Sequence, residues 1–228
     1  VIVEVKLVAK TIPVVEGLNT AEDLISYCAR VSNPNNQLNT ETAGGLLKYC
    51  LKHKHFSIFE TANLVMEIQT TRDISRQILR HRSFSFQEFS QRYASVDPEI
   101  VYREARIQDV KNKQNSIVCD DDHLCDEFAS EQKFIFDNAI ESYNNALEAG
   151  IAKEQARALL PEGLTSTRMY MNGTLRSWLH FCQVRCGVET QKECRLVAKE
   201  CCKIIIEEFP CLKELMTPLL EDNYSAEK

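Results

Sequence analysis

The 228-residue sequence predicts an α+β fold in one mixed domain. Two segments, 1–9 and 63–70, alternate apolar and polar residues, which is the period of a strand with one buried face. Several other segments repeat their apolar residues every three or four positions, as amphipathic helices do. No repeat, low-complexity tract or long linker divides the chain. We therefore expect a single domain over 1–228, with a central, mainly antiparallel sheet flanked by helices and a flexible tail after about residue 212.

The first half of the chain contains three predicted helices. Thr20 and Asp23 form a capping-box pattern that begins a helix ending near Val31. A second helix, 40–53, places its leucines on one side. A third and shorter helix, 73–81, leads into the sequence Arg-His-Arg.

The second half of the chain combines a long helix with shorter elements. The expected elements are an acidic surface loop (119–123), a long helix ending at Gly150, a short helix ending at Pro161, a strand (165–171), a turn (Asn172–Gly173), and helices over 174–186 and 190–210. Thr174 is suited to cap the first of the last two helices. Thr190 and Glu193 repeat the capping-box pattern at the second.

The composition excludes several classes of protein. No stretch approaches the roughly 18 uncharged apolar residues of a membrane helix, and no export signal is evident. We expect a cytoplasmic protein, or one of the host cytoplasm if the source is a virus, with no membrane partner. The seven glycines include no G-x-G spacing, which excludes the usual dinucleotide turn and the P-loop. The formal charge of −6 argues against a general nucleic-acid partner.

The ten cysteines are interpreted as reduced and mostly buried thiols, because several fall inside helical patterns. Cys119, His123 and Cys125 lack a second ligand pair at a standard zinc spacing. Cys182 and Cys186 could form half of a metal site, but core thiols are the more ordinary explanation. We expect no metal site, and no cysteine lies in a recognisably activated context.

The strongest chemical signal is a cationic segment at residues 77–93. It contains one carboxylate, Glu88, and three arginines: Arg80, Arg82 and Arg92. Guanidinium groups this close repel one another unless an anion lies among them, and phosphate fits their planar donors. If residues 88–93 are extended, Glu88, Ser90 and Arg92 project from one side. The alternative is a solvated basic turn beside core phenylalanines, and composition alone does not choose between the two.

The order of these residues resembles the signature of the flavin-dependent thymidylate synthases, the ThyX type. That signature is Arg80-His81-Arg82, seven intervening residues and Ser90, with Glu88 before the serine and Arg92-Tyr93 after it. Further segments that resemble the family are Arg30-Val31-Ser32, His53–Glu60, Glu154–Arg157 and Leu175–Arg185. The resemblance covers most of the chain. Only residues 105–130 and the tail after Pro210 carry no family signal.

The resemblance implies an enzyme, a methyltransferase that converts dUMP to dTMP in a homotetramer whose sites are shared between subunits. Reduced FAD would deliver the hydride, NADPH would reduce the flavin, and methylenetetrahydrofolate would supply the carbon. FAD would contact Ser32, His55, Ser57, Glu60, Arg80, His81, Arg82, Glu88, Thr174, Arg176 and His180. The dUMP site would contain Gln77, Arg80, Glu88, Phe89, Ser90, Gln91, Arg92, Arg157 and Arg185.

Within this scheme Arg185 is the expected catalytic residue, because a guanidinium near the pyrimidine stabilises negative charge at N3 and O4. Ser90 is assigned to binding, since only Glu88 beside it could activate a nucleophile. Arg176 and Arg185 are nine positions apart and so lie on opposite faces of a helix. If both contact ligands, the sites are assembled between subunits; otherwise one of the two is a surface arginine.

The resemblance is not complete. Ser57 stands where threonine is frequent, and Thr174 and His180 stand where asparagine is frequent. Each replacement keeps a hydrogen-bonding group. Two other hypotheses remain open: a relative that kept the fold without the activity, and a nucleic-acid-binding platform. The platform would consist of Arg80, Arg82, Phe84, Phe86, Phe89 and Arg92.

Overall fold

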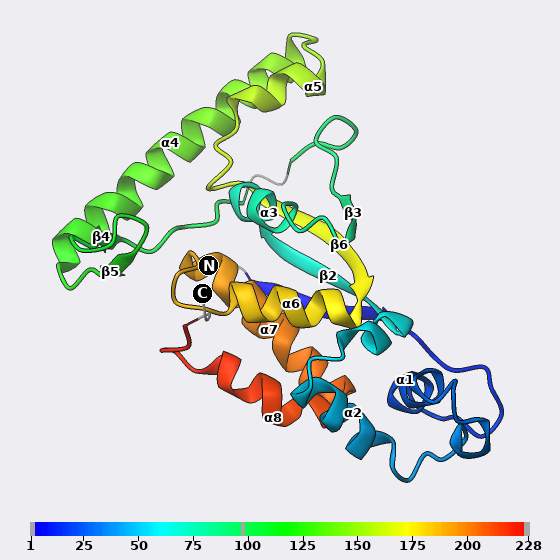
Figure 1. Ribbon diagram of the computed structural model, residues 1–228. Helices are drawn as coiled ribbons and strands as arrows, with labels where there is room; N and C mark the ends of the chain where they lie inside the picture. The colour runs from blue at the N-terminus through cyan, green and yellow to red at the C-terminus, as the bar shows by residue number, and fades with distance from the viewer. Residues whose placement is uncertain (1–2, 97–98, 226–228) are drawn as a thin grey trace. The chain divides into compact units, whose positions relative to one another are not determined.

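The computed structural model describes residues 3–96 and 99–225. Its main sheet has four strands in the order β1 (Glu4–Lys10), β2 (Asn63–Thr71), β6 (Ser166–Thr174) and β3 (Ser85–Glu88) (Figure 1). Strands β1 and β2 confirm the two alternating segments, although Val1 and Ile2 lie outside the described residues. In β2 the alternate residues Leu64, Met66 and Ile68 are fully buried.

Neighbouring strands of this sheet run antiparallel, because hydrogen bonds join the end of one strand to the start of the next. The backbone N of Thr11, just after β1, donates to the carbonyl oxygen of Asn63, the first residue of β2 (3.0 Å). The N of Leu175, which follows β6, donates to the residue before β2 (2.8 Å). The N of Phe89, after β3, donates to Arg168 near the start of β6 (2.9 Å). A mixed α+β fold with an antiparallel sheet is thus confirmed.

The remaining elements are helical, apart from an antiparallel pair of short strands, β4 (Arg106–Gln108) and β5 (Ser116–Val118). The α-helices are α1 (Ala21–Ala29), α2 (Ala43–Lys52), α3 (Arg72–Ile78), α4 (Asp122–Glu148), α5 (Lys153–Ala156), α6 (Leu175–Arg185), α7 (Lys192–Glu208) and α8 (Lys213–Met216). Short 3₁₀ helices are η1 (Pro34–Asn36), η2 (Phe56–Thr61), η3 (Arg157–Leu159), η4 (Pro210–Leu212) and η5 (Thr217–Leu220). Within the described residues, no helix is both long enough and apolar enough to span a membrane.

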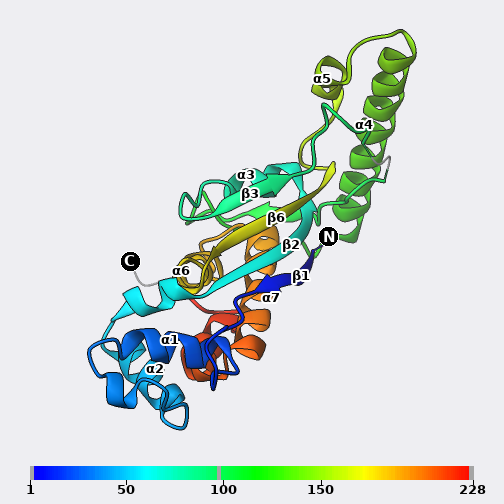
Figure 2. The ribbon, with the colours of Figure 1, turned by 90° about the vertical axis from the view of Figure 1, so that its right-hand side faces the viewer.

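The chain forms two compact units. The first unit contains residues 3–4, 69–80, 87–96 and 99–169, with α3, the β4–β5 pair, α4 and α5. The second unit contains residues 5–68, 81–86 and 170–225, in which α1 packs on α2 and α6 packs on α7 (Figure 2). The single domain over 1–228 stays a prediction.

The core of the second unit includes an aromatic cluster on the buried face of α6. Trp178 is fully buried, and its indole N–H donates to the carbonyl oxygen of Leu64 in β2 (3.2 Å). Phe84 and Phe181 meet the Trp178 ring edge-on, with centroid distances of 4.8 and 5.9 Å. The Phe84–Trp178 contact holds α6 against the segment before β3, and the indole hydrogen bond holds it against β2.

The predicted turn at Asn172–Gly173 is wrong, since β6 continues through both residues to Thr174. Gly173 is required by packing instead. A Cβ atom built on it would lie 2.3 Å from the ring of Phe84, far inside van der Waals contact. The glycine therefore permits the close approach of Phe84 to the backbone of the strand.

The helix starts test three cap predictions. The Thr20–Asp23 capping box at α1 is confirmed, and the Thr174 hydroxyl accepts from the N of Ser177 at the start of α6 (3.3 Å). The predicted capping box at Thr190 is wrong, because α7 begins at Lys192 and Gln191 occupies the cap position. The Thr190 hydroxyl donates instead to the carbonyl oxygen of Val184 in α6 (3.3 Å).

The acidic loop predicted at 119–123 is confirmed over 119–121, which form neither helix nor strand. The loop ends earlier than predicted, because Asp121 caps α4 by accepting from the N of Leu124 (3.1 Å) and Asp122 begins the helix. Acidic side chains are favourable at this end of a helix. The tail after residue 212 forms α8 and η5, in which Met216 and Leu219 are buried. The flexibility of the tail stays a prediction.

The C-terminus of α2 carries a strained residue. Lys54 has a φ of 58°, in the left-handed region that favours glycine. Its N–H donates to Leu51 (3.0 Å), and the N–H of His55 donates to Cys50 (2.8 Å), which is the pattern of a Schellman cap. This cap sets the direction in which the chain enters η2.

Replacing Lys54 by glycine is expected to raise the free energy of unfolding by about 0.5–1 kcal/mol, because glycine adopts this φ without a Cβ clash. Urea denaturation measures the change. The matched control is Lys52→Gly, at the last residue of α2, which is expected to lower the unfolding free energy by about 0.5 kcal/mol. A Lys54→Gly protein that is destabilised as much as Lys52→Gly would contradict the strain.

Candidate functional site

Most of the residues expected at one ligand belong to the same compact unit. The residues expected at FAD belong to the second unit, except Arg80 and Glu88. The residues expected at dUMP belong to the first unit, except Arg185. Each unit contains a cavity lined by members of its own set, as described below.

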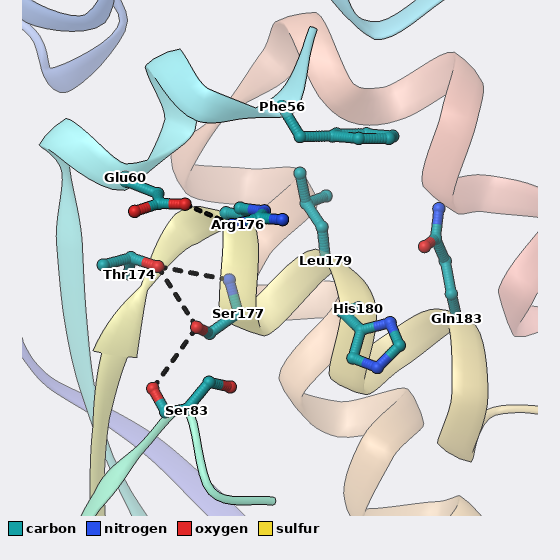
Figure 3. A pocket seen from close by; sticks show the side chains of 9 residues that line it. All are labelled: Phe56, Glu60, Ser83, Thr174, Arg176, Ser177, Leu179, His180 and Gln183. Atoms are coloured by element: carbon teal, nitrogen blue, oxygen red, sulfur yellow. Dashed lines mark hydrogen bonds and ion pairs between the residues drawn. The ribbon is translucent and has the colours of Figure 1, made fainter. Parts of the chain in front are cut away.

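The cavity of the second unit lies along the start of α6 and has a volume of about 510 Å³. Its lining residues come from η2, the segment before β3, the end of β6 and one face of α6: Phe56, Glu60, Ser83, Thr174, Arg176, Ser177, Leu179, His180 and Gln183 (Figure 3). The structure therefore brings together four residues of the FAD set: Glu60, Thr174, Arg176 and His180.

Polar contacts fix one wall of this cavity. Arg176 forms an ion pair with the carboxylate of Glu60, and both side chains are about half exposed. The hydroxyls of Thr174 and Ser177 lie 3.2 Å apart, and the Ser177 hydroxyl also lies 3.3 Å from the carbonyl oxygen of Ser83 (Figure 3). Thr174 thus acts as the N-cap of α6.

The opposite wall is apolar. Figure 3 shows the Phe56 ring above the Leu179 side chain, with His180 and Gln183 farther along α6. A cavity with one apolar wall and a charged rim suits a planar, partly polar ring system. Phe56, Leu179 and Gln183 are not in the predicted set. Residues 176, 179, 180 and 183 are spaced so that they share one face of a helix, and this spacing could have predicted Leu179 and Gln183.

Other residues of the FAD set do not line this cavity. Ser32 lies in a different cavity of about 480 Å³ beside Arg30, whose guanidinium donates to the Thr42 hydroxyl (2.7 Å). Arg30 therefore holds its own loop together. His55 and Ser57 are exposed at the start of η2, and the ring of His55 lies 6.1 Å from that of His53.

Arg185 lies on the other face of α6 and contacts His81. Its Nε donates to His81 Nε2 over 2.8 Å, and the His81 ring meets Phe181 edge-on at 5.0 Å. Because Nε2 accepts, the neutral imidazole carries its proton on Nδ1. The cavity on α6 is lined by Arg176 and not by Arg185, as the nine-residue spacing predicts. Arg82 is exposed.

The cavity of the first unit has a volume of about 300 Å³ and an ionic lining. The lining residues are Arg72, Arg76, Gln91, Glu154, Arg157, Ala158, Leu160, Glu162 and Thr165. Arg76 pairs with Glu162 (2.8 Å), and Arg92 pairs with Glu154 (3.1 Å). Gln91 and Arg157 of the dUMP set are thereby brought together. The cluster of guanidinium groups is suited to an anion such as phosphate.

The row of side chains expected if residues 88–93 are extended is not found, because the chain turns after Phe89. The N–H groups of Tyr93 and Ala94 both donate to the carbonyl oxygen of Ser90 (3.0 Å each), which closes a turn. Arg92 consequently reaches Glu154, and Ser90 is exposed. Glu88, Ser90 and Arg92 do not form one row of ligands.

Glu88 is held by three donors from its own unit. Its Oε1 accepts from Ser75 (2.7 Å) and Thr167 (3.0 Å) and lies 3.2 Å from the guanidinium of Arg72. Arg72 is 6% exposed and also donates to the carbonyl oxygen of Phe89 (3.3 Å). Its Nε has no hydrogen-bond partner among the residues that the structure describes. Sequence reasoning missed Arg72, which directly follows the buried end of β2.

The remaining predicted residues, Gln77 and Arg80, lie at the end of α3; Gln77 is half-buried and Arg80 is exposed. The nucleic-acid platform is not supported, because Phe84 is buried against Trp178 and is not available for stacking on bases.

The cysteines behave as core residues. Seven of the ten thiols are buried, among them Cys182 and Cys186, which confirms their interpretation as mostly buried thiols. Burial raises the pKa of the Cys182 thiol well above its ordinary value. No group of three or more His, Cys, Asp or Glu side chains in residues 3–96 and 99–225 is arranged to hold a metal ion.

Comparison with known proteins identifies the family. The model of the thymidylate synthase complementing protein family matches residues 13–211. A probable flavin-dependent thymidylate synthase of Paramecium bursaria Chlorella virus 1 is 53% identical over 213 residues, 92% of this chain and 97% of that one. The flavin-dependent thymidylate synthase of a Synechocystis species is 49% identical over 189 residues, 83% of this chain and 86% of that one.

Among solved structures, a UMP/dUMP methylase from Streptomyces cacaoi bound with 5-Br dUMP has the same fold. It superimposes with a TM-score of 0.81 at 24% identity, over 94% of each chain. With the family match over most of its length, the chain belongs to the flavin-dependent thymidylate synthases, a family of methyltransferase enzymes.

Proposed function

We propose that the protein catalyses the reductive methylation of dUMP to dTMP for nucleotide synthesis. Methylenetetrahydrofolate is the carbon donor, and FAD reduced by NADPH is the hydride source. The observation that supports this function best is the second-unit cavity, where Glu60, Thr174, Arg176 and His180 line one space with an apolar wall. Glu60 belongs to one segment of the family resemblance, and Arg176 and His180 belong to another, which Thr174 directly precedes.

The residues of that cavity fit a flavin. Phe56 and Leu179 offer an apolar surface for a ring system, while Arg176 offers charge-assisted donors for the anionic part of the cofactor. His180 and Thr174 add neutral hydrogen-bonding groups at the rim. When bound, the reduced flavin supplies the hydride. The protein's own part is to hold the ring and to exclude water from it.

The nucleotide is proposed to bind through the first-unit cavity. Arg157 and Gln91, which line this cavity, and Arg92, which pairs with the lining residue Glu154, are proposed to contact the phosphate. In the structure the Arg92 guanidinium pairs with the Glu154 carboxylate, and a phosphate would replace that carboxylate as its partner. Glu88 is held by Ser75 and Thr167 as an acceptor in a fixed position.

Arg185 is proposed as the catalytic residue. Its guanidinium stabilises the negative charge that develops at N3 and O4 of the pyrimidine, which makes C5 more nucleophilic. The bond from its Nε to His81 Nε2 fixes the plane of the guanidinium group. No covalent enzyme nucleophile is needed, in agreement with an exposed Ser90 and with a Glu88 carboxylate that contacts Ser75, Thr167 and Arg72.

A cytoplasmic homotetramer with sites shared between subunits is part of the proposal. The opposite faces taken by Arg176 and Arg185 on α6 support shared sites, because one compact cavity cannot use both. On α4, Phe134 and Ile135 are more than half exposed and provide apolar surface that another subunit could cover. The free thiols agree with a reducing compartment.

The purified protein is expected to be yellow, and its oxidation of NADPH is expected to accelerate when dUMP is added. A visible absorption spectrum and an assay of NADPH absorbance measure the two properties. Formation of dTMP should further require methylenetetrahydrofolate. Protein that remains colourless after incubation with FAD would contradict the proposal. Flavin binding without dTMP formation would indicate a relative that kept the fold and lost the activity.

A further inference from the structure

The C-terminal segment, residues 212–225, lies beyond the part of the chain that the family model matches, yet it packs closely on α7. Met216 and Leu219 are buried, and the carbonyl oxygen of Met216 accepts from the Cys202 thiol of α7 (3.6 Å). Such contacts require the segment to hold a defined position.

A buried lysine anchors the middle of this segment. Lys199 of α7 is 8% exposed, and its ammonium group donates to the carbonyl oxygens of Leu220 (2.9 Å) and Glu221 (3.0 Å) and to the carboxylate of Asp222 (2.9 Å). The hydrogen bond and the charge of Lys199 lower the pKa of Asp222 below its ordinary value. All three N–H donors of the lysine are used, which compensates for the burial of its charge.

Beyond this anchor, Tyr224 contacts the last turn of α6. Its hydroxyl donates to the carbonyl oxygen of Gln183 (3.1 Å), and its own carbonyl oxygen accepts from the N of Val188 (2.9 Å). The last four carbonyl groups of a helix lack partners within the helix, and Gln183 is one of these. Tyr224 therefore acts as a cap for α6 that comes from outside the helix.

The last residue of α6 is Arg185, two positions after Gln183. Helix ends fray unless they are capped, and Arg185 must hold its guanidinium 2.8 Å from His81. Its neighbour Val184 has a carbonyl oxygen that accepts from Thr190 (3.3 Å), so Tyr224 and Thr190 together fix this turn. The turn that carries the proposed catalytic arginine thus depends on the C-terminal segment.

We propose that the C-terminal segment positions Arg185 for the reaction, with Tyr224 as the positioning residue and Lys199 as its anchor. The inference rests on the proposed function, because it acts through Arg185 at the dUMP site. Displacement of a binding group by about 1 Å can reduce a rate by about 100-fold, so a single lost cap is large enough to be measured.

The test is Tyr224→Phe, which removes only the hydroxyl. Affinity for dUMP and the rate of dTMP formation are expected to fall about five- to tenfold, while FAD content and the melting temperature stay near those of the unchanged protein. The matched control is Tyr102→Phe in the first unit, which should change neither property. A Tyr224→Phe protein with unchanged dUMP affinity and rate would overturn the inference.

A double variant separates positioning from a general effect on the fold. If Tyr224 acts through Arg185, then adding Tyr224→Phe to Arg185→Ala should not weaken dUMP binding further, as measured by titration with dUMP. If the two effects add, the segment acts elsewhere and the inference fails. If Arg185→Ala alone leaves dUMP binding and turnover unchanged, the role of Arg185 in the proposed function fails instead. The two failures are therefore distinguishable.

Discussion

Replacing Arg185 by alanine is expected to reduce dTMP formation by at least about 100-fold, because a guanidinium that stabilises developing charge contributes on this scale. The FAD content of the variant should remain that of the unchanged protein, since Arg185 does not line the cavity with Glu60, Thr174, Arg176 and His180. Single-turnover formation of dTMP from dUMP, together with the flavin absorbance per subunit, measures both effects.

The informative control is Arg176→Ala, on the opposite face of α6. This change removes the partner of Glu60 and a donor from the proposed flavin cavity, so the loss should be in FAD content. Arg185→Ala protein that forms dTMP at the normal rate would contradict the catalytic assignment. Protein that purifies without flavin would place Arg185 at the cofactor instead.

Replacing Glu88 by alanine is expected to lower the free energy of unfolding by about 3 kcal/mol. The change would leave the guanidinium of Arg72 buried without its carboxylate, and it would remove the acceptor of the Ser75 and Thr167 hydroxyls. Both side chains of the pair are largely buried, so screening by solvent is small. Urea denaturation of the flavin-free protein measures the loss without contributions from bound ligands.

Ser90→Ala is the matched control, because Ser90 is exposed and near Glu88 in the sequence; its unfolding free energy should change by less than about 0.5 kcal/mol. Arg72→Met combined with Glu88→Leu should recover much of the lost stability, since apolar residues of similar volume remove both buried charges. An unchanged unfolding free energy in Glu88→Ala would show that Arg72 finds another partner or reaches solvent.

Patterns in the sequence predicted correctly those elements that depend on interactions between neighbouring residues. The alternation in β2 and the capping box at Thr20 depend on residues within a few positions of one another, and both are confirmed. The turn predicted at Gly173 failed because the glycine accommodates Phe84, which is distant in the sequence. The capping box predicted at Thr190 failed because its hydroxyl bonds to the preceding helix. Tertiary contacts decided both cases.

In the candidate site, too, some residues could be predicted from the sequence and others could not. The order of motifs supplied four of the residues that line the cavity on α6: Glu60, Thr174, Arg176 and His180. It did not supply their partners: Arg72 beneath Glu88 and Tyr224 at the end of α6 are set by the packing of distant segments. Hydrogen-bond partners that come from other parts of the fold leave no periodic signal in a single sequence.

The absence of a side chain at Gly173 has a consequence for Arg185, the proposed catalytic residue. The ring of Phe84 occupies the space that a Cβ atom would take, and the same ring meets His81 edge-on at a centroid distance of 6.4 Å. The His81 imidazole, which accepts from Arg185, therefore packs against the Phe84 ring, and Phe84 in turn packs directly on the backbone of Gly173. Substitution of Gly173 would therefore shift Phe84 and, through His81, the guanidinium of Arg185, so it would affect the position of the proposed catalytic arginine as well as the stability of the fold.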